Sequence, residues 1–296
     1  MDQPNNGTIL YFPIIACSFL GILGGIFNIL MIMVIVRRKS WHFHNLLLLT
    51  LSLSDLLIAL MHIFTLACFV STLFGGIEIF STLWYDCYIR EIFRYSFISV
   101  DFGTIVMLTI NGCLTVINRS KQIKYFESKP MKIGIILSLV LTSAPLTVAQ
   151  LRISQTELIF FAQLVRCINV RKIKYPLLIS PFINLITFCT CFGAVYRYVL
   201  RSRKRVSDMN SNNEVKWKLG ILKPLIIMIM VYVLFYFPYL LKEMLLVTDY
   251  MVREITLILA CIPYVSNPII FLLKKKNYKY LKRNFSRRNL MIINSL

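Results

Sequence analysis

Long apolar runs separated by short charged linkers dominate the pattern of this chain. Seven runs approach or exceed the roughly 20 largely apolar residues that a helix needs to cross a bilayer. The third run is the least uniform, because Arg90, Glu91, Arg94 and Asp101 lie in its first half. Its remainder is nearly uncharged, so we expect one helix whose polar start faces the bundle interior. The predicted spans are Tyr11–Val36, Leu46–Phe69, Tyr88–Val116, Ile133–Ala149, Leu177–Leu200, Leu222–Val247 and Ile255–Leu273.

The composition agrees with a membrane protein. Hydrophobic residues make up 57% of the chain and charged residues only 16%, with a mean hydropathy of +0.70. A soluble domain is usually nearer half apolar and a quarter charged. The net charge of +20 could indicate nucleic-acid binding. However, the basic residues cluster at the ends of apolar runs rather than on one polar face, so no nucleic-acid partner is expected.

The distribution of Lys and Arg predicts the orientation. The linkers after the first, third and fifth spans, together with the C-terminal segment, carry a large excess of basic residues. Such an excess marks the cytoplasmic side. We therefore expect a multi-pass plasma-membrane protein with an extracellular tail at 1–10, a membrane domain at 11–273 and a cytoplasmic segment at 274–296.

The C-terminal segment contains a short amphipathic pattern. In Asn277–Phe285, Tyr278, Leu281 and Phe285 alternate with Lys279 and Lys282 at helical spacing. We expect a helix on the inner membrane leaflet, the alternative being a disordered basic tail. The predicted fold is an all-α membrane protein, a seven-transmembrane helix bundle with this amphipathic C-terminal helix.

Two cysteines and one sequon fall on the predicted extracellular side. Cys87 starts the third span, and Cys167 lies in the loop 150–175. Because that compartment is oxidising, a disulfide between them is expected, and the alternative is two thiols. Asn6, in Asn6-Gly7-Thr8, is the predicted glycosylation site.

Several short motifs occur in a consistent order along the spans. They are Gly24-Gly25-Ile26-Phe27-Asn28, Leu51-Ser52-Leu53-Ser54-Asp55-Leu56, Trp84 before Cys87, Pro181, Phe235-Tyr236-Phe237-Pro238 and Asn267-Pro268-Ile269-Ile270-Phe271. In this order, from about residue 21 to 285, the chain resembles the rhodopsin-like family of G-protein-coupled receptors. The resemblance implies a non-enzymatic receptor that binds an extracellular ligand and signals to a heterotrimeric G protein.

A polar layer is expected in the middle of the bundle. A buried Asp in a spanning helix is costly and usually marks function. The resemblance implies that Asn28, Asp55 and Asn267 face one another and hold a sodium ion. Asp101 falls near the same layer, and two acids there would repel unless a cation or a proton intervenes. The alternative is a neutral hydrogen-bonded cluster.

Two prolines and one missing motif bear on signalling. Pro238 and Pro268 interrupt their helices and are expected to act as hinges, the alternative being static kinks. Asn111, Gly112 and Cys113 stand where the family has Asp-Arg-Tyr on the G-protein side. Without that arginine, the chain could also be a receptor that does not couple or that is constitutively active.

The ligand pocket is expected between the outer halves of the helices. Arg94 stands where amine receptors carry Asp, which favours an acidic small molecule or peptide. Aromatic walls would come from Tyr95, Tyr236, Tyr239 and Tyr264. The alternative is that Arg94 pairs with Glu91 and serves only the structure.

Other classes are less well supported. A transporter usually shows internal repeats, and none is visible here. Retinal is excluded because Ile255–Leu273 holds no Lys for a Schiff base. The three His residues, His42, His44 and His62, form no local metal-binding pair with acids or cysteines. Apart from sodium at Asp55 and the surrounding lipid, no metal or cofactor is expected.

Overall fold

The computed structural model describes most of the chain. The described residues are 7–37, 41–73, 83–153, 158–161, 166–169, 186–187, 189–190, 193, 197, 223–244 and 250–273, and nearly all of them are helical. Three predictions lie outside this range: the glycosylation site Asn6, most of the fifth span, and the amphipathic helix at Asn277–Phe285.

The long helices follow the predicted spans. They are α1 (Gly7–Arg37), α2 (Phe43–Leu73), α3 (Leu83–Ile117), α5 (Lys129–Ile153) and α9 (Tyr250–Leu272). Most extend a few residues beyond the apolar run. The hydrocarbon core is about 30 Å thick, but the headgroup regions add more than 10 Å, and there the flanking residues remain helical.

The sixth predicted span is helical but irregular. An apolar helix covers Lys223–Tyr239, and α8 continues over Phe237–Met244. A π-helical turn at Tyr232–Tyr236 comes directly before Pro238. Proline lacks an N–H group and crowds the preceding turn, and a π-turn accommodates that loss. The irregularity therefore occurs at the predicted hinge.

The linker after α3 contains a short helix that the sequence analysis did not predict. This helix, α4, covers Arg119–Phe126. The Asn118 side chain accepts a hydrogen bond from the backbone N–H of Lys121 at 3.0 Å. Asn is a favoured residue at this position because its oxygen satisfies an otherwise unpaired N–H at the helix start.

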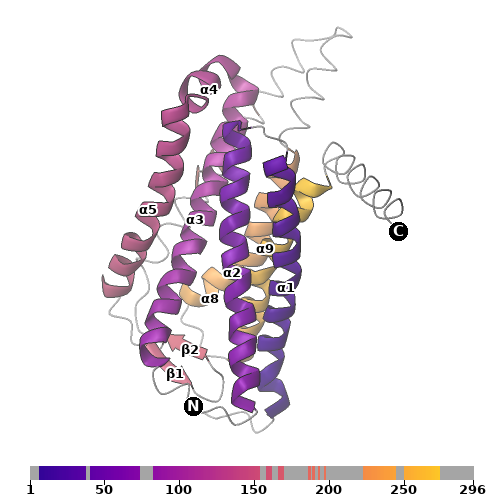
Figure 1. Ribbon diagram of the computed structural model, residues 1–296, viewed down its shortest axis with the longest axis vertical. Helices are drawn as coiled ribbons and strands as arrows, with labels where there is room; N and C mark the ends of the chain where they lie inside the picture. Colours follow the sequence, from indigo (N-terminus) through magenta and orange to yellow (C-terminus); the bar gives the residue numbers. More distant parts are fainter. Residues whose placement is uncertain are drawn as a thin grey trace, which may run out of the picture.

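The long loop after α5 contains a small hairpin, which was also not predicted. Strands β1 (Leu158–Phe161) and β2 (Arg166–Asn169) pair antiparallel, with Phe160 opposite Cys167. The hairpin lies at the opposite end of the bundle from α4 (Figure 1). We call these the hairpin end and the α4 end.

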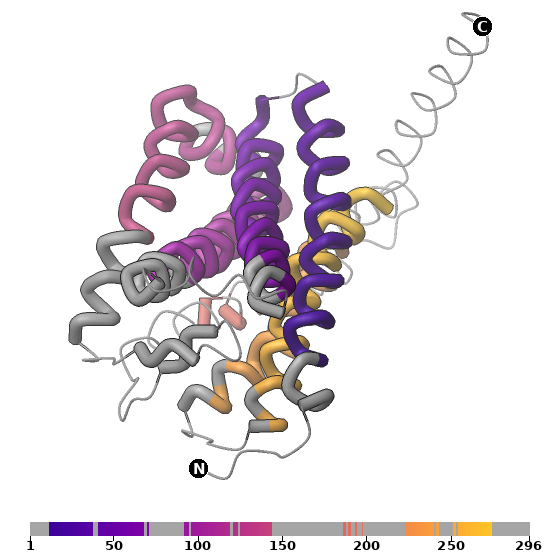
Figure 2. The backbone as a smooth tube through the Cα atoms, turned by 60° about the horizontal axis from the view of Figure 1, so that its bottom comes forward, coloured from indigo at the N-terminus to yellow at the C-terminus, as the bar shows by residue number. Residues whose placement is uncertain are grey.

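The described helices form one bundle around α2 and α3. α1 packs against α2 and α9, α2 packs against α3, and α3 packs against α5. In Figures 1 and 2, α5 lies on one flank of the bundle and α1 on the other.

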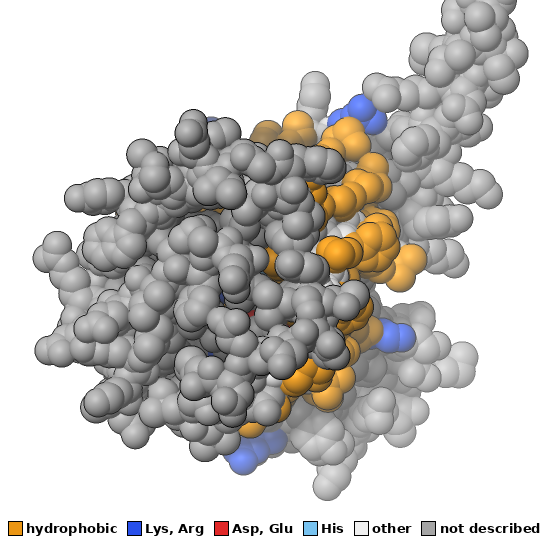
Figure 3. Space-filling view, turned by 90° about the horizontal axis from the view of Figure 1, so that it is seen from below, with side chains coloured by type: hydrophobic (Ala, Val, Ile, Leu, Met, Phe, Trp, Pro, Cys, Tyr) orange, Lys and Arg blue, Asp and Glu red, His pale blue; other side chains and the backbone are white. Residues whose placement is uncertain are grey.

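The bundle is apolar on the outside. On α1, large apolar side chains at intervals of three and four residues are exposed: Phe12, Ile15, Phe19, Ile22, Ile26, Ile29, Met33 and Val36. The opposite face buries Ser18, Gly21, Gly24 and Asn28. Seen from the hairpin end, hydrophobic side chains form a band along one flank (Figure 3). A helix surrounded by lipid is expected to bury its small and polar residues and to expose its apolar residues, as α1 does.

Four described helices are long and apolar enough to cross a membrane. They contain the segments Phe12–Arg37, Phe43–Ala67, Ile92–Ile117 and Glu254–Leu272. The fold class predicted from the sequence, an all-α membrane bundle, is therefore confirmed.

Candidate functional site

A buried polar layer joins three helices. Asp55 on α2, Asp101 on α3 and Asn267 on α9 are each at most 1% exposed. The Asn267 side-chain N–H group donates to Asp55 Oδ2 at 3.1 Å. Ser54 Oγ donates to Asp101 Oδ1. The carboxyl groups of Asp55 and Asp101 lie close enough together to interact electrostatically. The structure thus brings three of the predicted polar residues into one network.

Asn28 is held beside this layer by backbone contacts. Its Nδ2 donates to Gly24 O at 2.9 Å and to Tyr264 O at 3.1 Å. The second bond ties α1 to α9. The helices pack at ordinary contact distance here, since a Cβ at Gly24 would lie 3.5 Å from the Tyr264 carbonyl oxygen. Asn28 therefore holds α1 against α9, and its side-chain oxygen, Oδ1, is left without a hydrogen-bond donor.

The layer presents oxygens that no donor reaches. Within the described part of the chain, Asn28 Oδ1, Asp55 Oδ1, Asp101 Oδ2 and Asn267 Oδ1 are buried without a hydrogen-bond partner. Two adjacent buried carboxyl groups cannot both be ionised unless a cation offsets their charge. Oxygen ligands of this kind suit a hard cation. The arrangement can hold either such a cation or a shared proton.

Aromatic side chains connect the polar layer to the π-helical turn. Asn267 Nδ2 also donates to Tyr232 Oη at 3.1 Å. Tyr232 and Tyr236 both pack edge-on against Phe102 of α3, with ring centroids 5.6 Å and 5.0 Å away. The sequence analysis missed Tyr232. The available signal was a hydroxyl group inside an otherwise apolar run.

The predicted ligand contacts are mostly buried. Tyr236, Tyr239 and Tyr264 are 3%, 5% and 6% exposed, and Arg94 is half-buried. The side chains of Tyr95 and Glu91 lie outside the described residues. The sequence analysis overlooked a second cation in this region: Lys242 is buried, and its Nζ lies 5.1 Å from the centre of the Tyr239 ring.

The α4 end carries a hydrogen-bond chain where the Asp-Arg-Tyr motif is missing. Asn111, Gly112 and Cys113 are all buried. Asn111 Oδ1 accepts a hydrogen bond from Gln122 Nε2 of α4 at 3.0 Å. The same Gln122 nitrogen reaches Glu127 Oε1 at 3.4 Å. The end of α3 is therefore linked to α4 through a neutral contact.

Glu127 is the centre of a charged cluster at this end. Its Oε2 lies 2.6 Å from Lys132 Nζ and 3.6 Å from His42 Nδ1. Lys132 also donates to Trp41 O at 3.0 Å. Partial burial alone would raise the pKa of Glu127, but the hydrogen bond and charge of Lys132, with smaller contributions from Gln122 and the Phe43 backbone, lower it. The cluster joins the start of α2 to α4 and α5.

The two cysteines of the predicted disulfide belong to neighbouring elements. Cys87 belongs to α3 and Cys167 to β2, and β2 lies against α3. The side chains of both cysteines lie outside the described residues. The pairing stays a prediction.

The fold is similar to that of a solved structure. The chain is similar to squid rhodopsin, with a TM-score of 0.72 and 16% sequence identity, over 97% of this chain and 87% of that chain. The similarity establishes a rhodopsin-like seven-helix fold, so the chain is a multi-pass membrane protein. No family model and no curated protein sequence matches the chain.

Proposed function

We propose that this chain is a divergent G-protein-coupled receptor of the rhodopsin-like family. In this proposal it lies in the plasma membrane with its N-terminus outside, binds an extracellular ligand and activates a heterotrimeric G protein. The observation that carries the proposal is the network of Asp55, Asp101, Asn267 and Tyr232. It connects α2, α3 and α9 to the irregular helix at Pro238, which is the predicted hinge.

In this proposal the network acts as a two-state element. A cation or proton between Asp55 and Asp101 stabilises the arrangement in which α2, α3 and α9 are held together. Movement at the π-helical turn would pull Tyr232 away from Asn267 and weaken that arrangement. A ligand that favours the moved state would therefore shift the population towards it.

Sodium is the cation that we propose for this layer. The buried oxygens of Asn28, Asp55, Asp101 and Asn267 are all hard ligands. One sodium ion would offset the repulsion between the two carboxylates. The competing state is a single proton shared between Asp55 and Asp101.

An acidic ligand fits the charges near the hairpin end of the bundle. Arg94 is half-buried and Lys242 is buried, and both side chains carry a positive charge. In this proposal a carboxylate or phosphate of the ligand joins the interactions that these two side chains already make, and the walls come from Tyr95, Tyr236, Tyr239 and Tyr264. A buried, aromatic-lined site with a few fixed charges is typical for small ligands.

The contact that holds the end of α3 to α4 is weak, and this supports a high rate of G-protein activation without agonist. The Asn111–Gln122 hydrogen bond is neutral, and such bonds are roughly half as strong as charge-assisted ones. A receptor held inactive by so weak a contact would exchange nucleotide on its G protein without agonist. The second candidate, a receptor that does not couple, would show no exchange.

Sodium dependence tests the proposal. We expect purified receptor in lipid nanodiscs to unfold at a temperature several degrees higher in NaCl than in N-methylglucamine chloride at equal ionic strength. Asp55→Asn should abolish this difference. Thr109→Ala is the matched control, because the buried Thr109 hydroxyl bonds only within its own helix, to Ile105 O at 2.8 Å. It should keep the sodium effect.

Nucleotide exchange tests the signalling step separately. Wild-type receptor should raise basal exchange on at least one class of purified G protein above receptor-free membranes. Absence of exchange on every class would contradict coupling. Absence of the sodium effect in the wild type would contradict the cation site.

A further inference from the structure

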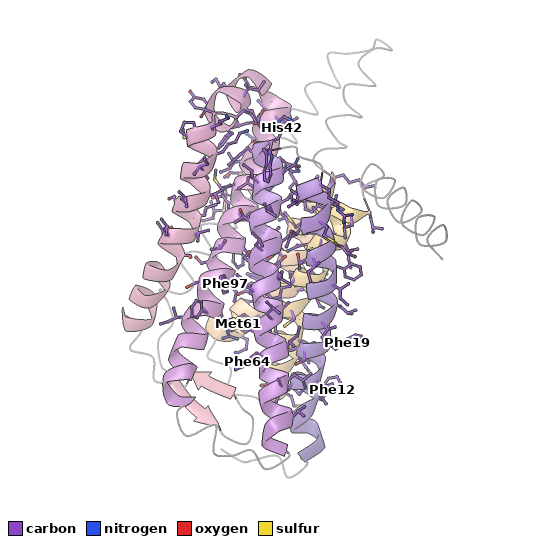
Figure 4. The ribbon with its side chains drawn as sticks, viewed as in Figure 1. Phe12, Phe19, His42, Met61, Phe64 and Phe97 are labelled. Atoms are coloured by element: carbon purple, nitrogen blue, oxygen red, sulfur yellow. The ribbon has the colours of Figure 1, made fainter. Side chains whose placement is uncertain are left out.

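Three metal-ligating side chains meet on the hairpin side of the polar layer. Cys17 comes from α1, His62 from α2 and Cys261 from α9, and their ligand atoms all lie within 4.8 Å of one another. Cys261 Sγ is 3.6 Å from His62 Nε2. Figure 4 labels the residues that flank two of them, Phe12 and Phe19 on α1 and Met61 and Phe64 on α2, in the half of the bundle away from His42.

The backbone holds these groups in place. Ser18 Oγ donates to His62 O at 3.1 Å, which ties α1 to α2 next to Cys17. Gly21 lets the two helices approach, because a Cβ there would lie 3.0 Å from the His62 Cβ and 3.1 Å from Ala59 O. Ile58 and Tyr264 belong to the same buried cluster as the two cysteines. The three ligands are therefore fixed by packing between helices.

The separations are close to those around a bound zinc ion. With Zn–S of about 2.3 Å and Zn–N of about 2.0 Å, tetrahedral geometry puts sulfur and nitrogen about 3.5 Å apart and two sulfurs about 3.8 Å apart. The Cys261–His62 distance of 3.6 Å is near the first value. The remaining separations are at most 4.8 Å, so these ligand atoms have to move towards one another by no more than about 1 Å to reach the zinc geometry.

Charge and access also favour a metal. Cys17 and Cys261 are both 3% exposed, so isolated thiolates there would be costly. Zn²⁺ with two thiolates and a neutral imidazole carries no net charge, which suits the interior of a membrane bundle. His62 is half-buried, so the cluster is not fully enclosed by the helices.

We infer that Cys17, His62 and Cys261 form a binding site for a zinc ion. Binding releases the two thiol protons and forms two Zn–S bonds and one Zn–N bond. Three protein ligands leave the fourth position open to water or an exogenous ligand. The ion would clamp α9 to α1 and α2, and this inference does not depend on G-protein coupling. The alternative is a thiol–imidazole hydrogen bond alone.

Metal binding to the full-length receptor in nanodiscs tests the inference. The protein is stripped with chelator, dialysed against Zn²⁺ and analysed for bound metal, and Co²⁺ is added separately to record a thiolate-to-cobalt absorption band. The variants are Cys17→Ser, His62→Gln and Cys261→Ser. Cys113→Ser is the matched control, since Cys113 is also a buried thiol but lies in the Asn111–Cys113 segment at the α4 end.

We expect one Zn²⁺ per wild-type receptor, a thiolate–cobalt band and a metal-dependent rise in the unfolding temperature. Each of the three variants should lower zinc affinity at least tenfold, and the serine variants should weaken the band. Cys113→Ser should behave as wild type. If wild-type receptor binds no zinc at micromolar concentration, or if the three variants bind it as well as wild type does, the site does not exist. Circular dichroism of each variant verifies that it is folded.

Discussion

Glu127 shows how one carboxylate can organise the α4 end. Its two oxygens contact Lys132 from α5, His42 from the start of α2 and Gln122 from α4. Both Glu127 and Lys132 are largely shielded, with side chains 21% and 12% exposed. The resulting pair should contribute more than a fully exposed ion pair, which is typically worth about 0–1 kcal/mol.

The lowered pKa of Glu127 predicts a pH-dependent contribution to stability. Because the folded pKa lies below the ordinary value of 4.5, ionised Glu127 stabilises the fold above that pH and loses its contribution as the pH falls through the folded pKa. We expect Glu127→Gln to lower the unfolding temperature by about 1–3 °C at pH 7. The difference should shrink as the solution is acidified below pH 4.5. Thermal unfolding across pH, with Lys121→Gln as an exposed control, measures it. A pH-independent difference would contradict this role.

Sequence reasoning found single polar residues better than clusters. Asp55 and Asn267 stood out because a charged or amide side chain is unusual in an apolar span. Cys17, His62 and Cys261 did not, since each is unremarkable within its own helix and the three meet only through packing between helices. Glu127 is the one acid in a basic linker, where its sequence position gave no indication of its partners.

At the scale of elements, the contact between α1 and α2 depends on small residues. Gly21 faces the backbone of α2 at Ala59. At Gly25 there is room for a methyl group, because a Cβ there would lie 3.9 Å from the nearest side-chain atoms, which is ordinary contact distance. Close approach through glycines is a common way for membrane helices to associate. The α1–α2 contact should therefore tolerate a side chain at one position and not at the other.

A pair of alanine substitutions tests this contact. Gly21→Ala should destabilise the protein by about 1–3 kcal/mol, because the new methyl group meets backbone that cannot rotate away. Gly25→Ala should leave stability unchanged or slightly raised. Thermal unfolding in nanodiscs compares the two. Equal effects of both substitutions would contradict the close packing at Gly21.

Helices were predictable here and the other elements were not. Apolar runs such as that within α1 define a spanning helix almost by length alone. The hairpin was missed because its strands have four residues each and no clear alternation of polar and apolar positions. The π-helical turn was missed because Pro238 predicts an interruption but not how the backbone accommodates it.

At the scale of the whole molecule, the exposed apolar stripe of α1 and the buried polar layer have the same cause, which is that lipid surrounds the bundle. Lipid replaces water on the outside, so apolar side chains are exposed and polar ones turn inward. Combined with the rhodopsin-like fold, this arrangement accounts for the high mean hydropathy and for the placement of charge at the helix ends. A seven-helix bundle predicts that the two termini lie on opposite sides of the membrane.

Epitope accessibility at the two termini tests this architecture most directly. A tag at the N-terminus should be labelled by antibody on intact cells. A tag at the C-terminus should be labelled only after the plasma membrane is permeabilised, because an odd number of crossings separates the termini and the excess of Lys and Arg predicts a cytoplasmic C-terminus. Labelling of both tags on intact cells, or of neither before permeabilisation, would contradict the predicted seven-crossing topology.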